Sequence, residues 1–162
     1  MEASSAVTIR HPNREKAESK ATKAIVVLLL LASGGLMLII TAGGWSDLQG
    51  AQFVAIACIL IYVLMAYYVA RWNRGVLPVA SALAVLIAVL AAIAAPAWFD
   101  RDKAGLHNPA LPPSLLGTLC IVLVGVSLFL IAFAMRGFQQ AWNVEVEEGP
   151  GASNPQAAYP SV

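Results

Sequence analysis

Charged residues are scarce in this chain and are missing from its longest hydrophobic runs. Aspartate, glutamate, lysine and arginine make up 12% of the 162 residues, about half of the roughly 25% that is usual in soluble proteins. Hydrophobic residues make up 59%, and a single domain of this length keeps too much surface to hide them all from water. The composition therefore excludes a water-soluble globular domain and indicates a membrane protein.

The chain also has almost no excess of positive over negative charge and only two cysteines. The net charge is +1, so the chain has neither a basic excess for nucleic acid nor an acidic excess for a basic partner. Its two cysteines, Cys58 and Cys120, both lie inside hydrophobic runs and do not suggest a secreted disulfide framework. We expect them to pack as small apolar side chains, although they lie at similar depth and could meet.

Four hydrophobic runs cover residues 24–43, 51–70, 76–99 and 114–135. At about 1.5 Å of rise per residue, a helix of each length crosses the roughly 30 Å hydrocarbon layer of a membrane. A backbone in hydrocarbon must satisfy its own hydrogen bonds, which only helices and closed barrels do, and barrel strands would alternate in polarity. The runs predict an all-α integral membrane protein, a four-helix bundle over residues 24–136 with short loops.

The regions outside the bundle are polar tails. Residues 1–23 form a basic tail in which a helix is expected from Asn13, whose side chain can cap it. In residues 137–162, Phe138 and Trp142 are four apart, so we expect about two turns of helix along the membrane surface. The glycines, prolines and small polar residues that follow predict a disordered C-terminal tail.

Basic residues are divided unequally between the two sides of the predicted bundle. Eight lie on the side of the termini and only Arg101 and Lys103 on the other. Since lysine and arginine in short loops mark the cytoplasmic side, both termini are expected in the cytoplasm, with the protein multi-pass in the cell membrane. The run ends carry the residues expected as anchors at the membrane interface: Trp45, Trp72, Trp98, Trp142, Arg71, Arg74 and Arg136.

No aspartate, glutamate, lysine, arginine or histidine lies within the four runs. A charge at the middle of a membrane helix costs roughly 2.5–3.5 kcal/mol, so chains retain one there mainly for a task such as proton relay or ion coupling. The sequence also has no nucleophile paired with a base and no membrane histidine for haem. We therefore expect no catalytic residue, no bound cofactor and no metal site.

The predicted outer loops hold the one group of polar residues that could collect a cation. Asp100, Asp102, His107 and Asn108 lie in the loop of residues 100–113, and Asp47 lies in the neighbouring loop. Their spacing matches no metal motif, and Arg101 and Lys103 compensate the acids, so a solvated loop is expected. The role of this loop stays open.

Small residues recur along the runs at the spacing of helix contacts. Such residues let helix backbones approach closely in lipid. They could form contacts within the bundle or a face for a partner subunit, and both readings stay open. The residues concerned are Ala80, Ala84, Ala88, Ala92, Gly34, Gly35, Gly117 and Gly125.

Inert helices with small-residue faces favour an accessory or structural subunit of a larger membrane assembly. Its partners would be the lipid bilayer and other membrane subunits or further copies of itself. The alternative is a small oligomeric transporter or pore for a neutral or lipid-like solute. For this alternative the runs offer only a fragmentary polar stripe, made of Ser33, Thr41, Ser81, Thr118 and Ser127. Separately, Tyr62 lies in the middle of its run, and its hydroxyl needs a partner such as Ser127 or a backbone carbonyl. An enzyme acting through the outer loops is a third reading, which no motif supports.

Overall fold

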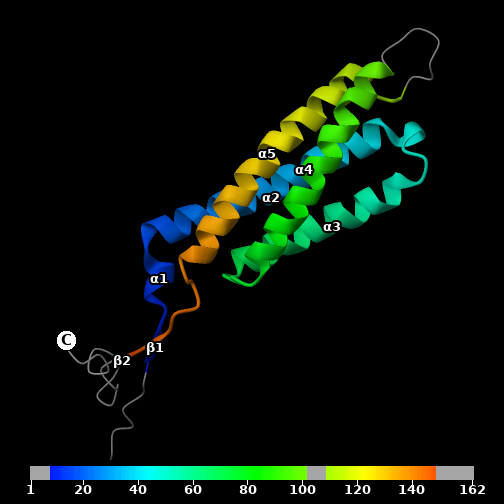
Figure 1. Ribbon diagram of the computed structural model, residues 1–162. Coiled ribbons are helices and arrows are strands. Elements are labelled where there is room, and N and C mark those ends of the chain that lie inside the picture. Colours follow the sequence, from blue (N-terminus) through cyan, green and yellow to red (C-terminus); the bar gives the residue numbers. More distant parts are fainter. Residues whose placement is uncertain (1–7, 102–108, 149–162) are drawn as a thin grey trace, which may run out of the picture.

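The computed structural model describes residues 8–101 and 109–148, and helices dominate it (Figure 1). Each of four helices is long and apolar enough to cross a membrane, so the predicted set of four apolar helices is confirmed. A 3-10 turn, η1 (Trp45–Asp47), lies between the first two. The four helices are α2 (Ala17–Gly43), α3 (Ala51–Ala70), α4 (Val76–Asp100) and α5 (Pro113–Gln139).

The N-terminal segment differs from the expected helix. A short helix, α1 (Pro12–Glu15), is separated from α2 by Lys16, whose ψ of 135° is extended. Proline is well placed at the first helical position, where its missing N–H is not needed. The expected Asn13 cap is wrong, because Asn13 lies inside α1 and its side chain donates a hydrogen bond to the carbonyl of Ala141 (3.1 Å).

The C-terminal segment also corrects the sequence analysis. Helix α5 continues beyond Arg136 but ends at Gln139, and the predicted surface helix through Trp142 is absent. Ala141 has a φ of +49°, so the chain turns and places Trp142 in the interior. Residues Val146–Glu148 then form strand β2, which pairs antiparallel with β1 (Thr8–Arg10). The rest of the expected disordered tail, residues 149–162, lies outside the described residues.

The four long helices do not pack equally. Helix α4 lies along α5 over most of its length, and α2 packs against both α3 and α5, whereas α3 touches α4 little. Besides Pro113 and Gly117, seven buried positions of α5 step alternately by four and three residues, the spacing of helices that pack as in a coiled coil. These positions are Leu116, Cys120, Leu123, Ser127, Leu130, Ala134 and Gly137.

Both described ends of the chain lie at the same end of the helices (Figure 1). This terminal end comprises α1, β1, β2 and the α3–α4 turn, residues 71–75. The opposite loop end comprises the α2–α3 and α4–α5 connections. There, the N–H of Leu111 donates to the carbonyl of Gly43 (3.2 Å), which joins the two connections.

Candidate functional site

The predicted alanine row of α4 does not form one packing face. Ala80 and Ala84 are buried, Ala88 is half-buried and Ala92 is exposed. A helix has 3.6 residues per turn, so positions spaced by four rotate about 40° per step and about 120° from first to last. The buried line passes instead to Ala91 and Ala95.

The four predicted glycines also lie in different surroundings. A Cβ added at Gly34 would lie 3.6 Å from the Cβ of Tyr62, and one at Gly117 would lie 2.9 Å from the ring of Phe99. Gly35 and Gly125 have no such neighbour within 4 Å. Gly34 and Gly117 therefore lie at close helix contacts, and the other two do not.

The four tryptophans lie at helix ends but only partly face outward. Trp45 is exposed and Trp72 half-buried, whereas Trp98 and Trp142 are buried. Of the predicted arginine anchors, Arg71 and Arg136 are exposed and Arg74 is half-buried. The boundaries of the hydrophobic runs predict which of these residues lie near helix ends. They do not predict which side chains are buried, because burial depends on contacts between helices.

Trp142 is the centre of a group of contacts at the terminal end, called here the terminal cluster. Its ring is fully buried and meets Trp72 edge to face at 5.3 Å between centroids. Its indole N–H donates to Gln140 (3.0 Å), and Gln140 donates in turn to the hydroxyl of Thr22 (3.0 Å). Arg14 donates to the Trp142 carbonyl (2.8 Å). These bonds tie the C-terminal segment to α1 and α2.

Two further cations complete the terminal cluster. Arg74 donates to the Phe138 carbonyl (2.7 Å) and to the side chain of Asn143 (2.9 Å), and its guanidinium lies 4.2 Å from the Phe138 ring centroid. Lys23 lies 4.1 Å from the ring centroid of Trp72. Cations over aromatic faces are attracted by the ring quadrupole, so the α3–α4 turn is also joined to the cluster.

At the loop end, the acidic residues considered as cation ligands are only partly described. The Asp47 carboxylate pairs with Arg101 at 3.4 Å, and Arg101 lies over the Trp98 ring at 5.6 Å. Asp100 is exposed, while Asp102, His107 and Asn108 lie outside the described residues. Within residues 8–101 and 109–148, no three His, Cys, Asp or Glu side chains come together as a metal site.

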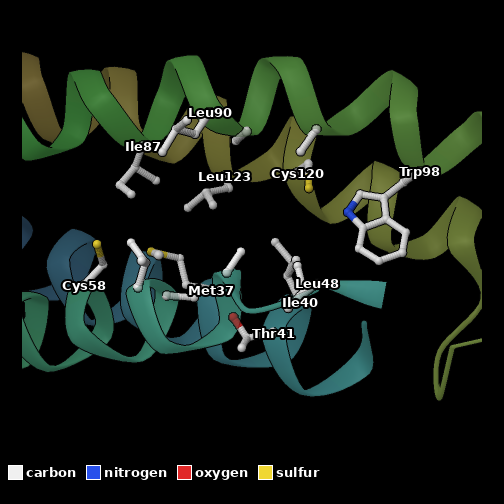
Figure 2. Close-up of a pocket in the computed structure, with 15 residues that line it drawn as sticks. Met37, Ile40, Thr41, Leu48, Cys58, Ile87, Leu90, Trp98, Cys120 and Leu123 are labelled. Carbon is white, nitrogen blue, oxygen red and sulfur yellow. The ribbon is translucent and has the colours of Figure 1, made fainter. Parts of the chain in front are cut away.

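A cavity of about 390 Å³, called here the α3–α4 pocket, lies where α3 and α4 stand apart. All four long helices contribute to its wall, and Figure 2 shows Cys58 near one end of it and Trp98 at the other. Among the described residues that line it, the polar side-chain groups are the Thr41 hydroxyl, the two thiols and the Trp98 indole. The pocket suits an apolar occupant, because apolar side chains make up the rest of its described wall.

Both cysteines line this pocket, but they do not form a pair. Cys58 and Cys120 are free thiols, and they enter the pocket from α3 and α5 on opposite walls (Figure 2). The sequence predicts that they lie at similar depth, but Figure 2 shows Cys58 near one end of the pocket and Cys120 nearer to Trp98. The sequence could not indicate a shared cavity, which depends on the separation of α3 from α4.

Three hydroxyl groups are fully buried beyond the inner end of the pocket, without a hydrogen-bond partner among the described residues. A hydrogen bond between Tyr62 and Ser127, which the sequence analysis considered, is therefore not formed. Each hydroxyl belongs to a residue one helical turn from a residue of the pocket wall: Ser33 from Met37, Tyr62 from Cys58, and Ser127 from Leu123.

A second, shallower hollow of about 440 Å³ lies between α4 and α5 and includes the exposed end of the alanine row. We call it the Ala92 hollow. Its wall is apolar throughout and is formed by Ala92, Ala95, Pro96, Phe99, Ile121 and Val124.

The described residues that line the two hollows are mainly apolar, so both hollows can hold apolar groups. No protein family, no curated protein and no solved structure matches this chain.

Proposed function

We propose that the chain is an accessory or structural subunit of a larger membrane assembly, with no catalysis of its own. The four helices cross the cell membrane as one bundle with both termini in the cytoplasm. Support for this orientation comes from the eight basic residues expected on one side, which lie in the terminal end or in the adjoining turns of α2 and α5. Basic residues are concentrated on the cytoplasmic side of membrane proteins.

The observation that carries the proposal is the Ala92 hollow. Ala92 is exposed, although small residues in membrane helices commonly lie where two backbones approach closely. Pro96 and Phe99 extend the same apolar surface toward the loop end, and Ile121 and Val124 form its other wall. We assign this surface to one transmembrane helix of another subunit, whose side chains fill the hollow.

A pair of alanine substitutions on α4 tests the proposal. Ala92→Phe fills the hollow, whereas Ala82→Phe places the same ring at an exposed alanine outside it. Each tagged variant is purified from native membranes in mild detergent and the co-purifying proteins are identified. We expect Ala92→Phe to reduce recovery of the partner about fivefold or more, because overpacking costs roughly 1–3 kcal/mol.

Ala82→Phe should recover the partner at the unsubstituted level. Recovery of the unsubstituted protein alone would overturn the proposal, and so would equal recovery of one partner by both variants. Size-exclusion chromatography of each purified variant checks that the protein remains folded and does not aggregate.

The α3–α4 pocket favours a second candidate, a small oligomeric transporter for a neutral or lipid-like solute. The hydroxyls of Ser33, Tyr62 and Ser127 continue inward from the pocket, so polar groups extend deeper into the bundle than its apolar wall. Recovery as a homo-oligomer in the same purification would favour this candidate over the accessory subunit.

A further inference from the structure

The α3–α4 pocket is an elongated space in the part of the bundle near the loop end. Its wall on α4 runs from Ile87, near the middle of that helix, to Trp98, near its end. At 1.5 Å per residue this is a length of about 16 Å, close to half of the roughly 30 Å hydrocarbon layer. The pocket therefore extends through one leaflet, from its surface to the midplane.

The dimensions of the pocket select among apolar occupants. A volume of about 390 Å³ spread over about 16 Å leaves a mean cross-section of roughly 24 Å², whereas a helix with side chains is about 10 Å wide and needs roughly 80 Å². A whole partner helix therefore does not fit inside the pocket, whereas a single acyl chain does. Since a water-sized group takes about 30 Å³, the space corresponds to about a dozen methylene groups in single file.

The wall reaches behind the lipid-facing surface into the core. Met37, Ile87 and Leu123 line the pocket and are buried at 8%, 4% and 4% exposure. A chain in the pocket would thus contact α2, α4 and α5 as well as α3. This sets it apart from the ordinary lipid layer, which touches only the outward faces of the helices.

The outer end of the pocket carries a cation. Arg101 lies over the ring of Trp98, which is part of the wall, and pairs with Asp47 (3.4 Å), while its side chain remains 42% exposed. Arginine is well suited to phosphate, and the loop end is where the headgroup of a lipid in this leaflet would lie. The shape and the apolar wall of the pocket match an acyl chain, and the exposed part of Arg101 lies where its phosphate would be.

We propose that the α3–α4 pocket is a binding site for one acyl chain of a phospholipid from the leaflet at the loop end. The chain passes between α3 and α4, fills the apolar space as far as Met37 and Ile87, and leaves the phosphate near Arg101. The bound lipid supplies the contacts between α3 and α4 that the protein does not make. This site is separate from the Ala92 hollow and does not depend on a partner subunit.

Photolabelling in lipid tests the proposal. The full chain is placed in nanodiscs that contain a phosphatidylcholine with a diazirine at the middle of one acyl chain, and adducts are mapped by mass spectrometry. We expect adducts on the buried wall residues Met37 and Leu123. Val26 and Leu130, which are fully buried outside the pocket, should carry none.

Two matched substitutions on α3 complete the test. Ala55→Phe fills the pocket from its wall, and Ala57→Phe places the same ring on the exposed surface of the helix. Adducts at Met37 and Leu123 should be lost in Ala55→Phe and retained in Ala57→Phe, while adducts at the lipid-facing Ile93 should persist in both. Ala94→Phe fills the pocket from α4 and should act like Ala55→Phe.

The proposal is overturned if Met37 and Leu123 remain as unlabelled as Val26. It is also overturned if labelling at these residues survives both filling substitutions. The adduct at Ile93 serves as the control for correct insertion of each variant.

Discussion

The contacts between α3 and α4 differ between the terminal end of the bundle and the α3–α4 pocket. At the terminal end, hydrogen bonds and cation–aromatic contacts connect both chain ends to the α3–α4 turn. Toward the loop end, α3 and α4 stand apart around an apolar pocket. Hydrogen bonds at the terminal end are directional, so they favour one arrangement of the chain segments. Apolar contacts in the pocket are not directional, so they do not fix one arrangement in the same way.

The terminal cluster therefore stabilises the fold, whereas the α3–α4 pocket has room for a bound molecule. The terminal cluster leaves little free space: a Cβ at Gly137 would lie 3.1 Å from Trp142 and 3.2 Å from Leu77. The α3–α4 pocket, in contrast, has room for about a dozen methylene groups. We therefore expect substitutions in the terminal cluster to cost stability and substitutions in the pocket to affect binding.

The largest expected effect is that of Trp142→Ala. Removing a fully buried tryptophan should lower the free energy of unfolding in lipid or detergent by about 3–5 kcal/mol, as measured by thermal or denaturant unfolding. Trp45→Ala is the matched control at the loop end, where the ring is exposed, and should cost less than about 1 kcal/mol. Equal losses in the two variants would remove the distinction between the ends.

Arg74→Met should cause the second-largest loss of unfolding free energy. The methionine keeps the apolar stem but loses the hydrogen bonds to Phe138 and Asn143, with an expected loss of about 1.5–3 kcal/mol in the same unfolding measurement. Arg71→Met alters an exposed arginine on the same turn and should change stability by about 0.5 kcal/mol or less. A larger loss from Arg71→Met than from Arg74→Met would contradict the terminal cluster.

A pair of glycines sharpens the comparison at the loop end. A Cβ at Gly44 would lie 2.6 Å from the buried ring of Trp98, so Gly44→Ala should destabilise by about 1–3 kcal/mol. Gly125 has open space and lies inside α5, so Gly125→Ala should stabilise by about 0.4–1 kcal/mol. Thermal unfolding of both variants checks the signs, and a stabilising Gly44→Ala would show that Trp98 is not held in place.

The smallest effect concerns pH and the exposed pair Arg10–Glu15. The hydrogen bond and charge of Arg10 hold the pKa of Glu15 below its ordinary value of 4.5. Because the folded-state pKa is lowered, the contact stabilises the N-terminal segment fully above about pH 4.5, and this contribution is lost as the pH falls through the lowered pKa.

Acidification slows the intrinsic exchange of backbone amides, and exchange of the α1 amides should slow by slightly less than this intrinsic change predicts, because the contact is lost. Glu15→Gln should abolish this difference, whereas Glu18→Gln should leave it in place. Its persistence in Glu15→Gln would assign the effect to another group.

The four helices were predictable because each hydrophobic run must cross the apolar layer as a helix. Run 51–70 coincides with α3, and the others lie within helices that extend further at one or both ends. The three-residue strands β1 and β2 carry no periodic signal that could have revealed them. The burial of Trp142 likewise depends on contacts with residues far apart in the sequence, Arg14 and Trp72.

The candidate sites were predictable only in their residue types. The alanine spacing indicated close contacts, but the rotation along α4 decides that Ala84 is buried and Ala92 is not. The runs predicted a similar depth for Cys58 and Cys120, whereas Cys58 lies farther from Trp98 along the pocket than Cys120 does (Figure 2). Their common pocket follows from the unequal packing of α3, which the sequence pattern does not express.

The most direct test of the account is the separation of α3 and α4 at their two ends, measured by double electron–electron resonance in phospholipid nanodiscs. One pair of spin labels replaces Tyr67 and Val79 near the turn, and the other replaces Phe53 and Ile93 beside the pocket; all four side chains are exposed. We predict a markedly longer distance for the pair beside the pocket, as the two ribbons indicate (Figure 1). Equally short distances at both ends would mean that α3 closes on α4 and leaves no room for an acyl chain.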